Sequence, residues 1–202
     1  ISLPGDLVEE IVRIDGLDNI EIPEAITITP AVEDNYAKEV YREKVANYLV
    51  GQGFNEMMTN SITNAAYFSE EELQSMVKMT NSLSTELNIL RNSLFETSLE
   101  VVAHNLNHKN NSLRLYEFGK SYSTSGPGKY VEAEKLCVII SGNKNEDSWK
   151  QKSTVSDFHL LKGTVDTVLK SLGVIADTLE IIQVPKLDNH IVYKLGNQII
   201  AG

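Results

Sequence analysis

The fold class is predicted from one stretch of the sequence, Leu113-Arg114-Leu115-Tyr116-Glu117-Phe118-Gly119. Apolar and polar residues alternate over its first six positions, which is typical of a strand with one buried face. A glycine- and proline-containing loop follows at residues 123–129. Residues 135–141 come next and are β-prone and apolar enough to be buried on both faces. These segments predict two strands joined by a loop or a hairpin turn.

Working outward, the spacing of apolar residues predicts helices over 35–49, 94–108 and 158–172, with a short helical patch near 65–68. Strands are predicted over 54–62, 179–184, 191–195 and 198–201. This order does not alternate strand with helix. We therefore expect an α+β domain with an antiparallel sheet flanked by helices.

The helix over 35–49 has an apolar stripe and a charged side that we expect to face water. The stripe consists of Val40, Tyr41, Val45, Tyr48 and Leu49. The charged side consists of Lys38, Glu39, Arg42, Glu43 and Lys44.

A separate short helix is predicted over residues 6–14, with Asp6 as its N-cap and Gly16 where it ends. Residues 18–30 contain two prolines and are predicted to be an extended connector. We therefore predict two domains, with residues 1–25 as the tail of a small helical or mixed domain and its connector, and 26–202 as the main domain. The chain begins at Ile1 and stops at Gly202 within a strand-like pattern, so we expect it to be cut at both ends.

The charge of the chain argues against a free-standing nucleic-acid binder. The formal net charge is −10 and the isoelectric point about 4.9, with lysine and arginine scattered along the sequence. RNA-binding domains usually carry a basic stripe that neutralises phosphates. Trp149 and Tyr130 lie in polar loops, and we expect no base-stacking platform there.

The single cysteine, Cys137, lies in an apolar run and is predicted to be a small buried residue in a reducing compartment. An apolar setting raises the pKa of a thiol, which disfavours a catalytic role. No apolar run approaches the roughly 20 residues that cross a bilayer, so we expect no membrane partner.

Two groups of side chains could bind metal ions. Asp6, Glu9 and Glu10 share one helix face and offer the oxygen ligands that Mg²⁺ prefers. The alternative is that they cap the helix and complement its dipole. His104 and His108 have the spacing of a zinc motif, but the general-base glutamate between them is missing. We expect these histidines to be surface residues.

The residues by themselves indicate no catalytic centre. The sequence has no glycine-rich phosphate loop, no Gly-x-Ser-x-Gly motif and no Cys/His pair that would activate a nucleophile. We therefore assign no catalytic residue and no cofactor-binding residue to this chain.

Three stretches in order resemble bacterial phenylalanyl-tRNA synthetase β subunits. The first is residues 5–20, Gly-Asp-Leu-Val-Glu-Glu-Ile-Val-Arg-Ile-Asp-Gly-Leu-Asp-Asn-Ile, with Leu17 where the family has tyrosine. The second is Leu90-Arg91-Asn92-Ser93-Leu94 together with Arg114-Leu115-Tyr116-Glu117-Phe118-Gly119. The third is Asp157-Phe158-His159-Leu160-Leu161-Lys162-Gly163, which departs from the family at positions 159 and 160.

The resemblance implies the fold of a class II aminoacyl-tRNA synthetase core that has lost its catalytic residues. In this family an (αβ)₂ enzyme in the cytoplasm attaches phenylalanine to tRNA(Phe), and the α subunit handles ATP. Editing domains lie upstream of the core and the anticodon-binding module lies downstream. The resemblance also implies a Mg²⁺ at the boundary with the α subunit, held by Asp6, Glu9, Glu10 and an Asp six residues before them. That last position falls ahead of Ile1, so we expect an incomplete and empty site in this chain.

We therefore expect a non-catalytic role as a scaffold for the α subunit. The contact residues are expected among Tyr41, Val45, Tyr48 and Leu49 or in residues 54–62, unless these pack within the domain. The alternative is a stand-alone class II-like paralogue that activates an amino acid itself. Such an enzyme needs arginines that clamp phosphate, and Arg91 and Arg114 are the basic residues placed to do so. We expect Arg114 to face solvent or an acidic partner.

Overall fold

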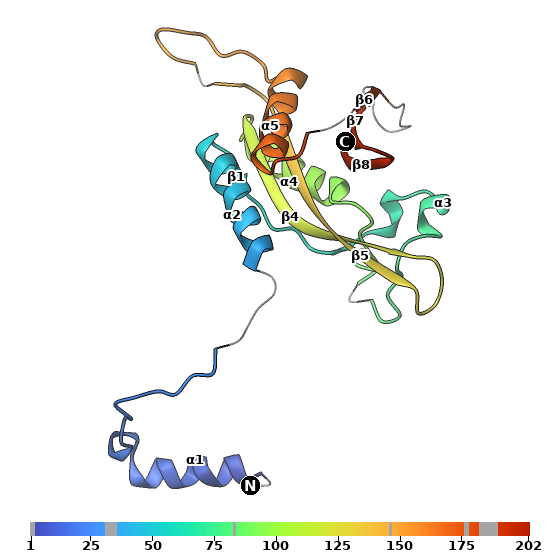
Figure 1. Cartoon of the computed structure of the whole chain (residues 1–202). Coiled ribbons are helices and arrows are strands. Elements are labelled where there is room, and N and C mark those ends of the chain that lie inside the picture. Colours follow the sequence, from blue (N-terminus) through green and yellow to red (C-terminus); the bar gives the residue numbers. More distant parts are fainter. Residues whose placement is uncertain (1–2, 31–35, 83, 146, 176–177, 182–189) are drawn as a thin grey trace. The chain divides into compact units, whose positions relative to one another are not determined.

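The computed structural model describes residues 3–30, 36–82, 84–145, 147–175, 178–181 and 190–202 of the chain. The chain divides into two compact units, Ile1–Tyr36 and Ala37–Gly202. The boundary predicted from the sequence, after residue 25, stays a prediction. Figure 1 shows the elements of each unit, which are described separately below.

A long hairpin forms the centre of the second unit. β4 (Leu113–Thr124) pairs antiparallel with β5 (Tyr130–Ser141) over their whole length, so that Tyr116 lies opposite Val138 and Glu117 opposite Cys137. β1 (Asn55–Glu56) joins the other edge of β4, but in the parallel sense. The sheet is therefore mixed, and the prediction of a purely antiparallel sheet was wrong at this edge.

Helices cover both faces of this sheet. On one face α2 (Tyr36–Gly51) and α5 (Phe158–Ser171) contribute Val45, Leu49 and Val168 to a core that includes Tyr116. On the opposite face α4 (Phe95–Asn107) packs Val102 against Leu113 and Leu115. Both faces of β4 are consequently buried, whereas the alternation in its sequence predicted a strand with one face in water.

The outer strand β5 is less buried than its composition predicts. Its described residues from 136 to 141 are half-buried and those from 130 to 132 are exposed. Position explains this, since β5 is an edge strand that is hydrogen-bonded on one side only. Its apolar residues Leu136, Val138 and Ile140 pack against the core beneath α2 and α5.

The predicted strand over residues 54–62 is divided. Only Asn55–Glu56 and β2 (Ile62–Thr63) are strands, and β2 pairs antiparallel with β3 (Ile89–Leu90). Between them the backbone N–H of Thr59 donates to the Glu117 carboxylate at 3.2 Å, and the carbonyl of Ser61 accepts from the N–H of Arg91 at 3.0 Å. These contacts take the segment away from strand pairing, which the local sequence does not reveal.

Smaller elements complete the second unit. A 3₁₀ turn (Ala65–Tyr67) and α3 (Glu70–Leu73) enclose a small cluster of Phe68, Met76 and Ile89. Near the C-terminus β6 (Thr178–Ile181), β7 (Ile191–Leu195) and β8 (Gln198–Ala201) form a separate antiparallel sheet. Residues 182–184 of the predicted strand over 179–184 lie outside the described residues.

The first unit consists of α1 (Pro4–Asp15), a 3₁₀ turn (Leu17–Asn19) and a connector without regular structure through residue 30. The helix begins earlier than predicted, with Leu3 as N-cap and Asp6 at the third helical position, so the assignment of Asp6 as N-cap was wrong. Proline is favoured in a first turn because its missing N–H is not needed there. None of the described helices is long and apolar enough to cross a membrane.

Candidate functional site

Arg91, one of the two arginines considered for phosphate binding, lies in a buried polar cluster. Arg91 follows β3 directly, and its side chain meets Glu117 in the middle of β4. Arg91 and Glu117 are both about 2% exposed, and Nη2 of Arg91 lies 3.0 Å from Oε1 of Glu117. A buried charge is tolerated only when it is paired and hydrogen-bonded, so the two residues depend on each other.

The other nitrogens of Arg91 also donate hydrogen bonds inside the protein. Nε donates to the carbonyl of Lys120 at 2.9 Å, and Nη1 donates to the hydroxyls of Thr97, at 3.3 Å, and Thr59. Glu117 accepts the Thr59 hydroxyl at 2.7 Å through its second oxygen. Each nitrogen of the guanidinium therefore has an internal acceptor, and the charge is neutralised by Glu117. Arg91 cannot clamp a phosphate in this arrangement.

Gly119 makes room for this cluster. A Cβ atom at this position would lie 2.5 Å from Nη2 of Arg91 and 2.6 Å from Cδ2 of Leu94. Both contacts are far shorter than van der Waals distance, and Arg91 is held by its hydrogen bonds. The glycine in the Arg-Leu-Tyr-Glu-Phe-Gly stretch is thus explained by packing against the buried arginine.

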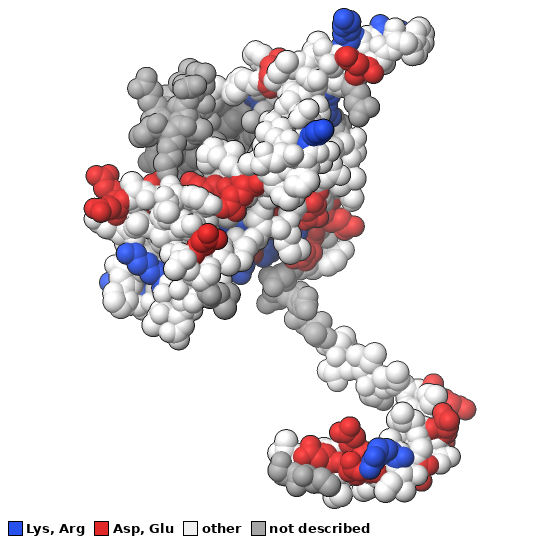
Figure 2. All heavy atoms as spheres, turned by 180° about the vertical axis from the view of Figure 1, so that it is seen from behind, with Lys and Arg blue, Asp and Glu red and all other residues white. Residues whose placement is uncertain are grey.

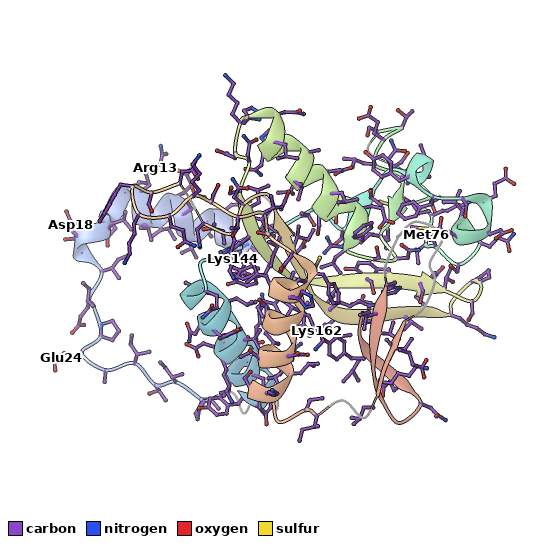
Figure 3. The ribbon with its side chains drawn as sticks, turned by 90° about the horizontal axis from the view of Figure 1, so that it is seen from above. Arg13, Asp18, Glu24, Met76, Lys144 and Lys162 are labelled. Carbon is purple, nitrogen blue, oxygen red and sulfur yellow. The ribbon has the colours of Figure 1, made fainter. Side chains whose placement is uncertain are left out.

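Arg114 lies at the start of β4 and is bound differently. Nη1 donates to the carbonyl of Gln52 at 2.7 Å and Nη2 donates to the carbonyl of Lys144. We had expected Arg114 to face solvent or an acidic partner; it is half-buried, and backbone carbonyls accept its hydrogen bonds. Arg114 also lines a shallow cleft of about 180 Å³ with Asn55, Ser112, Asn143, Lys144 and Asn145. Figure 3 labels Lys144, which comes from the segment after β5.

The apolar stripe predicted for α2 divides into two groups in the structure, and all of its residues except Val40 were expected contacts with a partner. Val45 and Leu49 are core residues at 3% and 0% exposure, and Tyr48 is half-buried against the same core. Val40 and Tyr41 are 41% and 54% exposed. In the other predicted contact segment, residues 54–62, Phe54 just before β1 is buried, whereas Met58 after β1 is 95% exposed. Exposed apolar groups of this kind are candidates for protein contacts.

The charged residues of α2 are all exposed, as the sequence predicted, and three of them also contact neighbouring elements. Lys38 forms an ion pair with Glu134 on β5, and this contact lowers the pKa of the Glu134 carboxyl. Arg42 lies 5.0 Å from the ring centre of Phe118, and Lys44 donates to the carbonyl of Ser171. Long cationic side chains can cover apolar surface with their stems, and here they bind α2 to its neighbours.

The three predicted magnesium ligands lie on α1. Asp6 accepts the backbone N–H of Leu3 at 3.1 Å, and Glu10 forms an ion pair with Arg13 at 2.6 Å. Among the described residues no three His, Cys, Asp or Glu side chains are grouped so that they could hold one ion. As they lie here, Asp6, Glu9 and Glu10 have the right ligand chemistry but do not converge on one point.

The two histidines of α4 and the single cysteine have other side chains or backbone groups as neighbours. The rings of His104 and His108 lie 4.3 Å apart, and Nδ1 of His108 is 2.7 Å from the carbonyl oxygen of His104, at the end of α4. Cys137 is half-buried, burial raises the pKa of its thiol, and its sulfur accepts the Ser98 hydroxyl at 3.5 Å. The raised pKa of the Cys137 thiol agrees with the effect expected from its apolar setting, although the residue is half-buried and not fully buried.

Sequence reasoning missed Thr59 and Thr97, which complete the buried cluster. Neither stands in a recognisable motif, and they are 38 residues apart in the chain. The available signal was Glu117, a carboxylate in an otherwise apolar strand, since a buried acid requires a cation and further hydrogen-bond donors.

Comparison with known proteins agrees with this arrangement. Residues 22–194 match the model of the phenylalanyl-tRNA synthetase beta chain CLM domain. The chain belongs to the phenylalanyl-tRNA synthetase β-chain family. Relatives in this family include the phenylalanine–tRNA ligase beta subunit of Bacteroides thetaiotaomicron, 37% identical over 83% of this chain and 22% of that protein. The beta subunit of Bacillus subtilis is 32% identical over 94% of this chain and 24% of that protein.

The chain therefore spans less than a quarter of the curated β-chain relatives it matches. Among solved structures, a pyrrolysyl-tRNA synthetase of Desulfitobacterium hafniense is similar with a TM-score of 0.59 at 18% identity, over 81% of this chain and 54% of that chain. This likeness concerns the fold alone. It establishes a synthetase-like fold for this member of the phenylalanyl-tRNA synthetase β-chain family.

Proposed function

We propose that the chain is a non-catalytic part of a phenylalanine–tRNA ligase β subunit that holds the α subunit in an (αβ)₂ enzyme. That enzyme attaches phenylalanine to tRNA(Phe) in the cytoplasm, and the α subunit handles ATP. The observation that carries the proposal is the state of Arg91. The guanidinium is buried, paired with Glu117 and hydrogen-bonded through each nitrogen.

Phosphate binding requires an arginine whose donors point at the ligand. Arg91 is buried and each of its nitrogens already donates inside the protein, and Arg114 donates from both terminal nitrogens to backbone carbonyls. The synthetase-like fold is thus present with Arg91, its buried candidate for phosphate binding, used to hold the protein together. A scaffold that belongs to a larger enzyme explains both facts better than an independent ligase does.

The outward side of α2 is the proposed contact with the α subunit. Val40 and Tyr41 are exposed here, while Val45 and Leu49 fix the other side of the same helix in the core. Association that depends on such a surface is driven by burial of its apolar groups. We therefore expect the contact to involve Val40 and Tyr41 rather than the buried half of the predicted stripe.

The test is co-purification of the chain with the matching α subunit, measured by size-exclusion chromatography with light scattering. We expect a stable complex, and we expect Tyr41→Asp to weaken it by placing a charge in an apolar contact. Tyr130→Asp, at the exposed start of β5, is the matched control and should leave the complex intact. No association together with ATP–pyrophosphate exchange by the chain alone would replace this proposal with the stand-alone activating paralogue.

We further propose that Asp6, Glu9 and Glu10 supply oxygen ligands to a Mg²⁺ in the whole enzyme, together with ligands outside the described residues. Glu10 would have to leave Arg13 for this. Bound metal can be measured in the heterotetramer by elemental analysis. The variant Glu9→Gln/Glu10→Gln should lower the magnesium content, and Glu21→Gln/Glu24→Gln on the connector should not. Equal metal content in all three proteins would contradict the proposed ligands.

A further inference from the structure

An arm projects from the sheet between β5 and α5 (Figure 1). It consists of residues 143–155, of which all but residue 146 are described. At its base Asn143 and Val155 form a β-bridge, and the N–H of Lys144 donates to the carbonyl of Thr154 at 2.7 Å. Arg114 holds the same base from β4, since it donates to the carbonyl of Lys144. The base of the arm is therefore fixed to the sheet by hydrogen bonds.

A turn near the tip presents the only tryptophan of the chain. The N–H of Ser148 donates to the carbonyl of Gln151 at 2.9 Å, and the N–H of Gln151 donates to the Ser148 hydroxyl at 3.1 Å. Trp149 and Lys150 stand between these two residues, and Trp149 is 97% exposed. A large aromatic ring is thus held in water by an ordered turn. Such exposure of apolar surface usually marks a binding function.

The sequence neighbours of Trp149 are polar and charged, with more lysines than carboxylates. Lys150 and Lys152 follow it in the sequence, and Lys144 stands at the base of the arm. The arm contains three lysines against Glu146 and Asp147. The Asp147 carboxylate accepts the N–H of Ser153 at 2.6 Å, a bond that lowers the pKa of the Asp147 carboxyl. Figure 2 shows basic side chains on the projecting arm with an acidic neighbour.

The cleft at the base of the arm is also lined by cationic and polar residues. Its lining combines Arg114 and Lys144 with asparagine, serine and glycine, and it includes no carboxylate. Neither Arg114 nor Lys144 takes part in an ion pair between described residues. The volume of about 180 Å³ is below the range of about 300–1,000 Å³ that encloses a small-molecule ligand. A cationic cleft of this size suits one phosphate of a strand that continues outside it.

We propose that the arm and this cleft form a contact for single-stranded RNA, with a base stacked on Trp149 and a backbone phosphate at Arg114 and Lys144. Proteins that bind single strands combine aromatic stacking with cations along the backbone. A protein partner fits less well, because the core of a protein interface is depleted in lysine and here the ring has polar and lysine neighbours. The proposed function enters only in naming the RNA, which would be an unpaired segment of the tRNA.

The chain allows a direct test, because Trp149 is its single tryptophan and its fluorescence reports on this residue alone. A tRNA(Phe) transcript, oligoadenylate and ATP are titrated separately into the 202-residue chain. We expect saturable quenching by both RNA probes and weak quenching by ATP, which offers one base without a continuing strand. No quenching by RNA, or equal affinity for ATP, would overturn the proposal.

Variants separate stacking from charge. Stacking on one aromatic ring is worth about a five- to hundredfold change in affinity, so Trp149→Ala should weaken RNA binding by that factor in filter binding. Tyr130→Ala, an exposed aromatic elsewhere, should bind as the parent does. Lys150→Ala/Lys152→Ala should reduce the slope of log affinity against log salt by about 0.7 per lost phosphate contact. Lys129→Ala, in the β4–β5 turn, is the charge control.

The same variants are assembled with the α subunit to distinguish this proposal from the preceding one. Trp149→Ala should form the complex as readily as the parent protein while binding RNA less tightly. A weakened complex with unchanged RNA binding would show that Trp149 docks on a protein and would overturn the RNA contact. If the parent chain does not bind the α subunit at all, the scaffold role fails, yet fluorescence quenching still decides the RNA contact.

Discussion

Arg91 follows β3 and Arg114 stands near the start of β4, and the fold treats these two arginines in opposite ways. Arg91 is about 2% exposed, and its charge is neutralised by Glu117. Arg114 is half-buried beside an open cleft and gives its donors to backbone carbonyls. The first arginine belongs to the interior and the second keeps a charge near solvent. Whether an arginine can bind a ligand therefore depends on its burial and on its ion-pair partner, and the presence of the arginine in a motif does not decide it.

The strongest test of this contrast is Arg91→Met. The substitution keeps an apolar stem of similar length but leaves Glu117 buried without its cation, which costs about 3–5 kcal/mol. We expect that loss in the free energy of unfolding, measured by urea denaturation followed by far-UV circular dichroism. A loss below about 1 kcal/mol would mean that the pair behaves like a surface ion pair.

A second variant separates the buried charge from the packing. In Arg91→Met/Glu117→Leu both charges are absent, and replacing a buried pair by apolar residues is often neutral or stabilising. Thr59 and Thr97 still lose partners, so we expect recovery of most, though not all, of the stability. If the double variant is as unstable as the single one, the cost lies in packing rather than in the unpaired charge.

The next effect is expected at Gly119. In Gly119→Ala the new methyl group would meet Arg91 and Leu94 at 2.5 Å and 2.6 Å. Overpacking of this kind costs about 1–3 kcal/mol. Gly163→Ala, on α5 with open space around the added Cβ, is the control and should not be destabilised, because alanine is the better helix former. The same urea series measures both, and equal loss at the two positions would contradict the explanation given for Gly119.

Arg114→Met should have a smaller effect than Arg91→Met. It removes two hydrogen bonds to the carbonyls of Gln52 and Lys144, each of which contributes about 0.5–1.5 kcal/mol at most because water can replace the donor. We expect a loss of about 1 kcal/mol in unfolding free energy, measured beside Arg91→Met. Equal losses would remove the distinction between the two arginines.

The sequence predicted the elements well where local patterns decide them. The helices over residues 94–108 and 158–172 were located to within a residue or two, because their apolar spacing and the glycine at 173 are local signals. Long-range contacts produced the errors. The strand over 54–62 is divided by hydrogen bonds with Arg91 and Glu117, which lie more than 25 residues away in the chain.

The same limit applies to the sites. The half-buried strand predicted over residues 113–118 did not reveal that Glu117 is buried, because the packing of α4 on one face of β4 is a long-range contact. Trp149 was dismissed as an aromatic in a polar loop. Lys150 and Lys152 stood next to it in the sequence, but the turn that exposes the ring and the cleft at the base of the arm require the three-dimensional structure.

The ion pair between Lys162 and Asp166 is intermediate in burial between Arg91 and a surface ion pair. Asp166 accepts hydrogen bonds from Lys162 at 2.7 Å and from the Tyr193 hydroxyl at 2.8 Å, and its side chain is about one-third exposed. Figure 3 labels Lys162. The Lys162 contact lowers the pKa of the Asp166 carboxyl below its ordinary 3.8. Burial and the same carboxylate raise the pKa of Tyr193.

The sign of the resulting pH dependence follows from the lowered pKa of Asp166. The unfolded chain binds a proton on this carboxyl more readily than the folded one does, so stability from Asp166 is present above the unfolded pKa of 3.8 and is lost as pH falls through the lower folded value. Asp166→Asn should therefore be less stable than the parent protein at pH 6, with a difference that shrinks as the pH falls below 3.8. Solvent screens a partly exposed pair, so the effect should be smaller than that of Arg91→Met. A difference that stays constant down to pH 2 would show that Asp166 acts through packing and not through its charge.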